Sequence, residues 1–254
     1  MSTVIEGIYR SGVVHDESGG EYRLSSQMDR AEGRALSHLI ESDSAVRNTL
    51  EVGCAFGLSS LYICSALAGK ESPRHIIVDP YQNTEWHGVG IANLRRAGYD
   101  FFELIERPSE FALPDIVEDQ AGDYDLVFID GWHTLDQTLL DLYYANRLVR
   151  QGGYIVVDDC RMPSVARAVS YVSRYPAYER LRGLDKQLRP GPGAVSPARR
   201  IGDIVRRLVP PTIAGYVMPK MVFDQYYVRL IYPSMVALRK VALDERSWDW
   251  YTAC

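Results

Sequence analysis

The sequence contains little cysteine and no long apolar run. Its four cysteines, Cys54, Cys64, Cys160 and Cys254, have neither the spacing of a metal site nor that of a disulfide framework. No stretch of 18 consecutive apolar residues occurs, so the sequence predicts no membrane-spanning helix. Residues 1–10 lack the basic-then-apolar order that marks a secretory signal. We therefore expect a cytoplasmic protein with reduced thiols.

Positive charge is scarce outside one segment. The 254-residue chain has a net charge of −5, but residues 181–240 hold eleven of its 28 lysines and arginines and only three of its 33 acidic residues. The rest of the chain is strongly acidic, which argues against a nucleic-acid-binding core. In the basic segment, residues 187–197 resemble a linker and residues 199–208 a basic amphipathic helix. That helix could contact an anionic membrane or an acidic acceptor, or form the solvated face of a lid or oligomer contact.

The most informative stretch runs from Thr49 to Ser60. It reads as a short buried strand, a turn containing Gly53 and Gly57, and the beginning of a helix. Such a turn lets the backbone approach a ligand in front of a helix N-terminus. Glu51 precedes the turn, where a carboxylate suits a positively charged ligand group but not a pyrophosphate. This placement favours S-adenosylmethionine over a dinucleotide.

The pattern of buried strands predicts a parallel sheet. Strands that end in acidic residues are expected at 49–52, 75–79, 124–130 and 154–159, and another strand at 102–105. Helices are expected at 25–41, 58–68, 89–97, 116–120 and 134–149, after an irregular arm at 1–24. The alternation of strands and helices indicates a doubly wound α/β fold. Ligands of such folds bind beyond the carboxyl ends of the strands.

Asp79 ends the second of these strands, 22 residues beyond Gly57. In nucleotide-binding folds, a carboxylate at this distance accepts hydrogen bonds from ribose hydroxyls. An acidic cap at the strand end is the alternative interpretation.

Asp130, Asp158 and Asp159 end two strands that we expect to be neighbours. Gathering three carboxylates is unfavourable unless a cation neutralises them. Oxygen ligands favour Mg²⁺, with Mn²⁺ and Ca²⁺ as alternatives. His133 follows Asp130 by three residues at a helix start, where an imidazole could accept a hydroxyl proton. Alternatively, His133 only packs there while Thr134 caps the helix.

These residues carry a family resemblance. The motifs Glu51-x-Gly53-x-x-x-Gly57, Asp130-x-x-His133 and Asp158-Asp159, with Asp79, resemble class I S-adenosylmethionine-dependent methyltransferases. Within that class they are similar to the metal-dependent macrocin O-methyltransferase group and, more distantly, to catechol O-methyltransferase. The resemblance covers residues 25–178 and a short strand at 235–241.

The resemblance implies a Rossmann-like methyltransferase fold, which is a doubly wound, mostly parallel seven-stranded sheet with helices on both faces. It divides the chain into four parts. These are an N-terminal arm (1–24), an S-adenosylmethionine-binding core (25–182), a basic insertion or lid (183–232) and a C-terminal strand and tail (233–254).

The resemblance also implies roles for single residues. Glu51 would meet the amino group of the methionine part, Asp79 the ribose and Ser109 the adenine, while His133 would be the catalytic base. The implied metal ligands are Asp130, Asp158 and Asp159. The implied cofactor contacts are Glu51, Gly53, Ala55, Gly57, Ser59, Asp79, Ser109 and Asp130.

The expected function is that of an S-adenosylmethionine- and divalent-metal-dependent O-methyltransferase, acting on a hydroxyl of a sugar or glycosylated small molecule. Three alternatives remain: methylation of a catechol or phenol, a non-catalytic binding partner with this fold, and an oxidoreductase that uses Asp79 on a ribose. No nucleic-acid partner is expected. Peripheral membrane contact through residues 199–208 and a homo-oligomer stay open.

Overall fold

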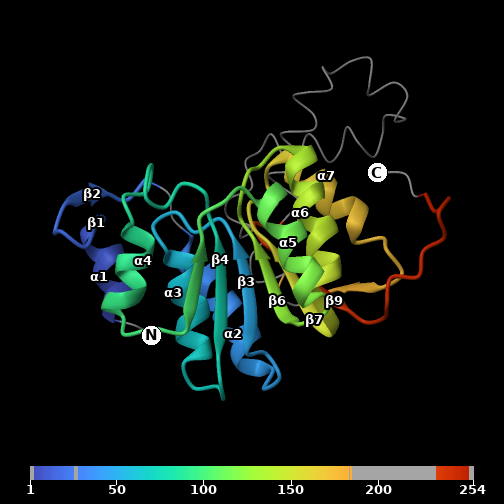
Figure 1. The fold of residues 1–254 in the computed structure, drawn as a ribbon, viewed down its shortest axis with the longest axis horizontal. Coiled ribbons are helices and arrows are strands. Elements are labelled where there is room, and N and C mark those ends of the chain that lie inside the picture. Colours follow the sequence, from blue (N-terminus) through green and yellow to red (C-terminus); the bar gives the residue numbers. More distant parts are fainter. Residues whose placement is uncertain (1–2, 26–27, 183, 185–232, 252–254) are drawn as a thin grey trace, which may run out of the picture.

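The computed structural model describes residues 3–25, 28–182, 184 and 233–251. In this part of the chain a seven-stranded sheet lies between two layers of helices (Figure 1). The strands of this sheet are β3 (Asn48–Val52), β4 (Arg74–Val78), β5 (Phe102–Ile105), β6 (Tyr124–Ile129), β7 (Val149–Val157), β8 (Tyr178–Arg180) and β9 (Val236–Lys240). The helices beside it are α2 (Arg30–Ser42), α3 (Leu58–Leu67), α4 (Val89–Arg96), α5 (Ser109–Gln120), α6 (Leu135–Leu148) and α7 (Pro163–Val172).

The strand order is β5-β4-β3-β6-β7-β9-β8. The first five strands are parallel, whereas β9 is antiparallel to both β7 and β8. From β3 the chain moves outward through β4 and β5 and then returns to β6 on the other side of β3. Ligands of such sheets bind at this reversal. The predicted doubly wound, mostly parallel seven-stranded sheet is confirmed.

Helices cover both faces of the sheet because its strands are apolar on both sides. Every residue of β6 is buried. On one face, α2, α3 and α4 share a core with Phe128. On the other, α5, α6 and α7 share a core with Leu50. Because strand side chains alternate between the faces, neighbouring residues such as Leu50 and Glu51 enter different layers.

The first 24 residues are not the irregular arm that the sequence predicts. Helix α1 (Thr3–Ser11) buries Ile5 and Ile8 against the core. Strands β1 (Val13–His15) and β2 (Glu21–Arg23) then form an antiparallel hairpin, and Tyr22 stacks on His87 with ring centroids 4.3 Å apart. Strands of three residues are too short for an alternating pattern to reveal them.

Two helices begin at residues other than the predicted ones. Helix α2 begins at Arg30 instead of Ser25, because Asp29 caps it: the Asp29 carboxylate accepts from Ala31 N at 2.7 Å. The Glu32 carboxylate in turn accepts from Asp29 N at 2.8 Å. Helix α5 begins at Ser109, seven residues before the predicted start, and its internal proline interrupts the helical pattern in the sequence.

The predicted C-terminal strand is confirmed as β9, whereas the three-residue β8 was not predicted. Of the predicted insertion at 183–232 only Leu184 is described, so the predicted linker at 187–197 and helix at 199–208 lie outside the described residues. No helix in the described part of the chain combines the length and apolar character that crossing a membrane requires.

Candidate functional site

A cavity of about 610 Å³ opens beyond the carboxyl ends of β3, β4, β6 and β7. It brings together all the predicted site residues except Glu51 and Gly57. Those in its lining are Gly53, Ala55, Ser59, Asp79, Ser109, Asp130, His133, Asp158 and Asp159. The predicted edge of the sheet therefore does carry a cavity, and the role of each residue in it stays a prediction.

The turn between β3 and α3 follows a left-handed backbone path. Gly53 and Gly57 have φ angles of 86° and 81°, and Ala55 adopts 48°. A Cβ on Gly53 would lie 2.1 Å from the Asp130 carbonyl oxygen. A Cβ on Gly57 would lie 2.8 Å from Gly90 Cα, and a Cβ on Gly90 would lie 2.7 Å from the Ala55 carbonyl oxygen. The turn therefore needs these glycines for close packing. Gly57 packs against Gly90 and does not line the cavity.

Asp79 follows β4 and binds the glycine turn. Its Oδ2 accepts from the backbone N–H groups of Cys54 and Ala55, both at 2.9 Å, and from Gln82 Nε2 at 3.0 Å. Its Oδ1 accepts from Tyr81 N at 2.9 Å. Asp79 is thus a cap that fixes the turn, and it also lines the cavity, so the predicted ribose contact stays a prediction.

Glu51 does not reach the cavity. Its side chain is fully buried on the α3 side of β3, where it accepts a short hydrogen bond from Ser60 Oγ. Its Oε2 lies 3.2 Å from Nε2 of His75, which is also buried. The direct contact predicted with a ligand amino group therefore does not fit the geometry, because the alternation along β3 turns this carboxylate into the helix layer.

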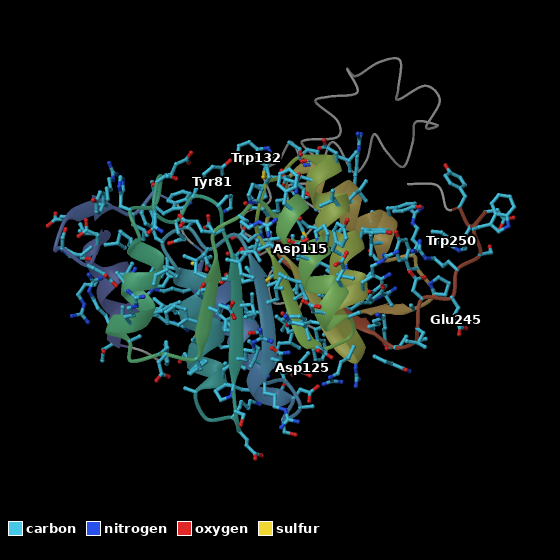
Figure 2. The ribbon with its side chains drawn as sticks, viewed as in Figure 1. Tyr81, Asp115, Asp125, Trp132, Glu245 and Trp250 are labelled. Carbon is cyan, nitrogen blue, oxygen red and sulfur yellow. The ribbon has the colours of Figure 1, made fainter. Side chains whose placement is uncertain are left out.

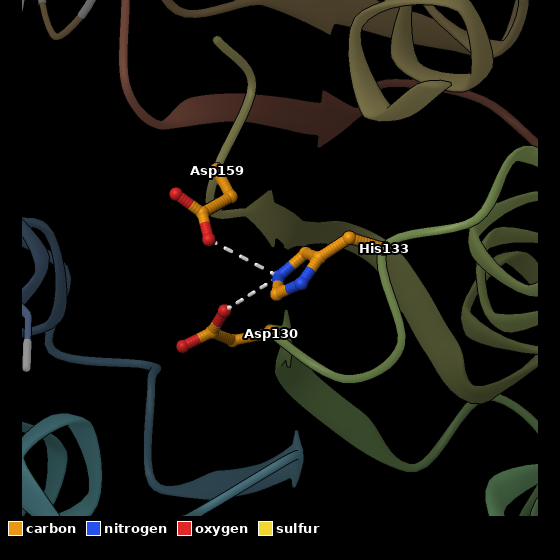
Figure 3. Close-up of side chains that lie close together, drawn as sticks. All are labelled: Asp130, His133 and Asp159. Carbon is orange, nitrogen blue, oxygen red and sulfur yellow. Dashed lines mark hydrogen bonds and ion pairs between the residues drawn. The ribbon is translucent and has the colours of Figure 1, made fainter. Parts of the chain in front are cut away.

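Asp130, His133 and Asp159 form the one cluster of potential metal ligands found among the described residues (Figure 3). His133 Nε2 lies 3.3 Å from Asp130 Oδ1 and 3.2 Å from Asp159 Oδ2, and the ligand atoms of all three lie within 4.8 Å of one another. Asp158 lines the same cavity but is not one of these three residues, and its Oδ1 accepts the backbone N–H of Asp159 at 2.8 Å. The structure thus groups the predicted base, and not Asp158, with the other two predicted ligands.

The cavity is strongly acidic. Among the described residues, seven carboxylates line it and no lysine or arginine does. Burial raises the pKa of Asp130 to about 6, and burial together with Asp130 raises the pKa of Asp158. The hydrogen bond with Asp130 raises the pKa of His133. The pKa values of Asp130 and Asp158 are raised because ionised carboxylates are unfavourable in a partly dehydrated site and close to one another. A bound cation would stabilise their ionised forms.

The sequence reasoning missed a polar cluster beneath Ser109. Gln137 lines the cavity from α6, and Asp141 lies one turn further along the same helix. Ser109 Oγ donates to Asp141 Oδ1 at 2.7 Å, and Gln137 Nε2 donates to Ser109 Oγ at 2.9 Å. The signal was present in the sequence, because Gln137 and Asp141 stand four residues apart, with Asp141 on the helix face that also carries Leu142 and Ala145.

Asp141 supports a prediction on pH and stability. It is 1% exposed, and burial raises its pKa to about 6. Between about pH 4 and pH 6 the folded state keeps a proton that the unfolded state has released, so its contribution to stability falls as the pH rises through that window. We expect Asp141→Asn to raise the free energy of unfolding at pH 7.5 by on the order of 2 kcal/mol.

Urea denaturation at pH 4 and pH 7.5 measures this effect. The variant should gain stability relative to the wild type only at the higher pH. Equal stability differences at both pH values would show that Asp141 does not hold its proton abnormally in the folded protein.

Comparisons with known proteins agree with this arrangement. Residues 50–160 match the sequence model of a family described as a methyltransferase domain. No curated protein matches the chain in sequence. Many solved structures match the chain, and three of them, each less than 25% identical to it, illustrate the shared fold.

The first is an O-methyltransferase from Bacillus cereus in complex with SAH, which is 16% identical with a TM-score of 0.58, over 71% of this chain and 83% of that chain. The second is the O-methyltransferase TomG from Streptomyces achromogenes in complex with SAM, 20% identical with a TM-score of 0.51, over 61% and 73%. The third is the cofactor-bound protein Rv0187 from MTB, 23% identical with a TM-score of 0.52, over 61% and 73%. Residues 50–160 thus match a methyltransferase domain, and the chain has the fold of these solved structures.

Proposed function

We propose that the chain is an S-adenosylmethionine- and divalent-metal-dependent O-methyltransferase, with a hydroxyl of a sugar or glycosylated small molecule as its acceptor. The observation that carries the proposal is the cluster of Asp130, His133 and Asp159 in the cavity beside the glycine turn. The shared fold of O-methyltransferases from Bacillus cereus and Streptomyces achromogenes supports transfer to oxygen.

The donor atoms of the cavity fit a divalent cation. Asp130 and Asp159 would hold it, with Asp158 or His133 as a third ligand. The oxygen-only set suits Mg²⁺, and an imidazole ligand would favour Mn²⁺ or another transition-metal ion. When bound, the ion would supply positive charge that lowers the pKa of the acceptor hydroxyl.

His133 is the proposed base. The carboxylates of Asp130 and Asp159 flank its Nε2 and would stabilise the imidazolium that proton transfer creates. Ser164 Oγ donates to the His133 carbonyl oxygen at 2.5 Å and so ties the histidine backbone to α7. The acceptor hydroxyl gives its proton to the imidazole while its oxygen attacks the methyl carbon, and the sulfur leaves in line as the thioether of S-adenosylhomocysteine.

Two aromatic side chains at the mouth of the cavity support a ring-shaped acceptor. Trp132 is 64% exposed and Tyr81 40% exposed, although both line the cavity (Figure 2). Their faces can pack against the apolar face of a sugar ring or against an aromatic ring. The same observation makes a catechol or phenol the second candidate acceptor.

Transfer of a labelled methyl group from S-adenosylmethionine to matched acceptors tests this proposal. We expect product with a glycosylated acceptor in the presence of Mg²⁺ or Mn²⁺, and none after addition of EDTA. Methylation of simple catechols alone would replace the sugar by the second candidate. Binding of S-adenosylhomocysteine without transfer to any hydroxyl would contradict the enzyme and support a non-catalytic binding partner.

Asp79→Ala is expected to weaken the binding of S-adenosylhomocysteine roughly 10- to 100-fold. The substitution removes the acceptor that holds the turn and, in the proposed complex, a charge-assisted hydrogen bond to the ribose. Isothermal titration measures the dissociation constant. Glu103→Ala, which alters an exposed carboxylate on β5, is the matched control and should leave the constant unchanged. An unchanged constant for Asp79→Ala would leave this residue as a strand cap alone.

A further inference from the structure

The hydroxyl of Ser109 is held from behind the cavity wall. Ser109 and Gln137 line the cavity, whereas Asp141 does not. Asp141 Oδ1 accepts from Ser109 Oγ at 2.7 Å. Asp141 Oδ2 has no hydrogen-bond partner among the described residues, and a Cβ on Gly131 would lie 3.6 Å from it. The carboxyl group thus lies directly under the loop that follows Asp130.

The hydrogen bonds of the Ser109 hydroxyl determine whether it can donate to a ligand or only accept from one. A serine hydroxyl has one proton and two lone pairs. Asp141 Oδ1 takes the proton, and it still accepts, more weakly, if the carboxyl group carries its own proton on Oδ2. Gln137 must then present its amide nitrogen, because its oxygen would compete for the same proton. One lone pair of Ser109 remains for the cavity, and no proton does.

Glu110 gives the cavity a second hydrogen-bond acceptor next to Ser109. Its carboxylate also lines the cavity, with Oε2 3.5 Å from Gln137 Nε2. The start of α5 therefore presents the cavity with a hydroxyl lone pair and a carboxylate, which are both acceptors. A ligand group that donates a hydrogen bond is stabilised there, whereas a carbonyl oxygen would face a lone pair and a negative charge.

The strand order indicates which ligand group comes here. The cluster at the ends of β6 and β7 is where methyl transfer is proposed, and the glycine turn after β3, Asp79 after β4 and Ser109 after β5 follow along the same edge. A methyl donor with its sulfonium at the β6–β7 end and its ribose at Asp79 brings its base to Ser109. Adenine carries a 6-amino group, which donates.

We propose that Asp141 is a positioning residue that fixes Ser109 as an acceptor for the 6-amino group of the methyl donor, and so makes the cavity reject a 6-oxopurine. This inference rests on the proposed function. The site then selects an adenine nucleoside by the direction of one hydroxyl proton, which a carboxyl group outside the cavity controls.

The test compares S-adenosylhomocysteine with its 6-oxo analogue S-inosylhomocysteine, in which an oxo group replaces the 6-amino group and N1 carries a proton. By isothermal titration the wild type should prefer the adenosine ligand roughly 10- to 100-fold. Ser109→Ala should reduce this ratio to less than half its wild-type value. Asp141→Leu should do the same, because the freed hydroxyl can turn and donate to the oxo group. Asp141→Asn keeps an accepting oxygen and should keep the preference.

The ratio of the two constants separates positioning from general damage. Asp125→Asn is the matched control: Asp125 is also buried, but it binds the backbone N–H groups of Arg47 and Asn48 at the opposite end of the molecule from Trp132 (Figure 2). It should lower the melting temperature and leave the ratio unchanged. If Asp141→Leu does not fold, an unchanged ratio in Ser109→Ala is enough to overturn the inference.

The same titrations distinguish failure of this inference from failure of the proposed function. Equal binding of both ligands by the wild type overturns this inference alone. Binding of neither ligand overturns the proposed methyl donor itself.

Discussion

Replacing His133 with alanine is expected to lower kcat by roughly 10²–10⁴-fold. The imidazole lies between two carboxylates in the cavity, so its loss removes the proposed proton acceptor from the reacting hydroxyl. The loss should be smaller for an acidic phenol than for a sugar hydroxyl, because an acceptor that is already ionised needs no base. Steady-state kinetics with one acceptor of each kind, at saturating metal, measures the difference.

His133 could act as a metal ligand instead of a base, since the structure groups it with Asp130 and Asp159. Titration of Mn²⁺ into the His133→Ala variant separates the two roles: a base leaves the metal affinity nearly unchanged, whereas a ligand takes affinity and kcat down together. His38→Ala, which alters an exposed histidine on α2, is the matched control for both measurements. A collapsed melting temperature with unchanged residual kcat would make His133 a structural residue.

Asp159→Asn is expected to abolish measurable turnover, with a loss of roughly 10³-fold or more, while S-adenosylhomocysteine still binds. Asp159 contributes a carboxylate to the cluster with Asp130 and His133, and a metal worth several kcal/mol of barrier would be lost with it. Asp158→Asn should also lower turnover, because Asp158 holds the Asp159 backbone as well as lining the cavity.

The matched control for these variants is Asp115→Asn. Asp115 forms an exposed ion pair with Arg107, a kind of contact that contributes little to stability, so its removal should leave kcat unchanged. The wild type should lose its activity in excess EDTA and regain it when Mg²⁺ or Mn²⁺ is added back. Full activity of Asp159→Asn in excess EDTA would remove the metal from the mechanism.

The sheet and its functional edge could be predicted because their signals are local. Each buried strand is a short apolar run, and the acidic residue that ends it must lie at the carboxyl edge once the strands are parallel. Asp79, Asp130, Asp158 and Asp159 therefore come to one cavity, as their positions after three such runs predict.

The features of the site that could not be predicted depend on which helices pack on which face of the sheet. Glu51 stands one residue before the end of β3, and the sequence alone does not reveal that its side chain enters the layer of Ser60 and His75. The same limit applies to Asp158 and Asp159, since a left-handed backbone at Asp159, with a φ angle of 50°, turns these neighbours to different partners. The hairpin of β1 and β2 was missed because its strands are only three residues long, and the side-chain contacts of Asp16 and Tyr22 that stabilise it have no periodic signature in the sequence.

The close packing of the glycine turn against Gly90 limits how this turn can evolve. A methyl group on Gly57 would press on Gly90, and one on Gly90 would press on the Ala55 carbonyl oxygen, so neither position can gain a side chain while the turn and α4 keep their distance. If either glycine is replaced first, the turn must shift before the other can be replaced. Descendants of this chain should therefore inherit both glycines as a pair, and a homologue that lacks one of them should carry a rebuilt approach between the turn and α4.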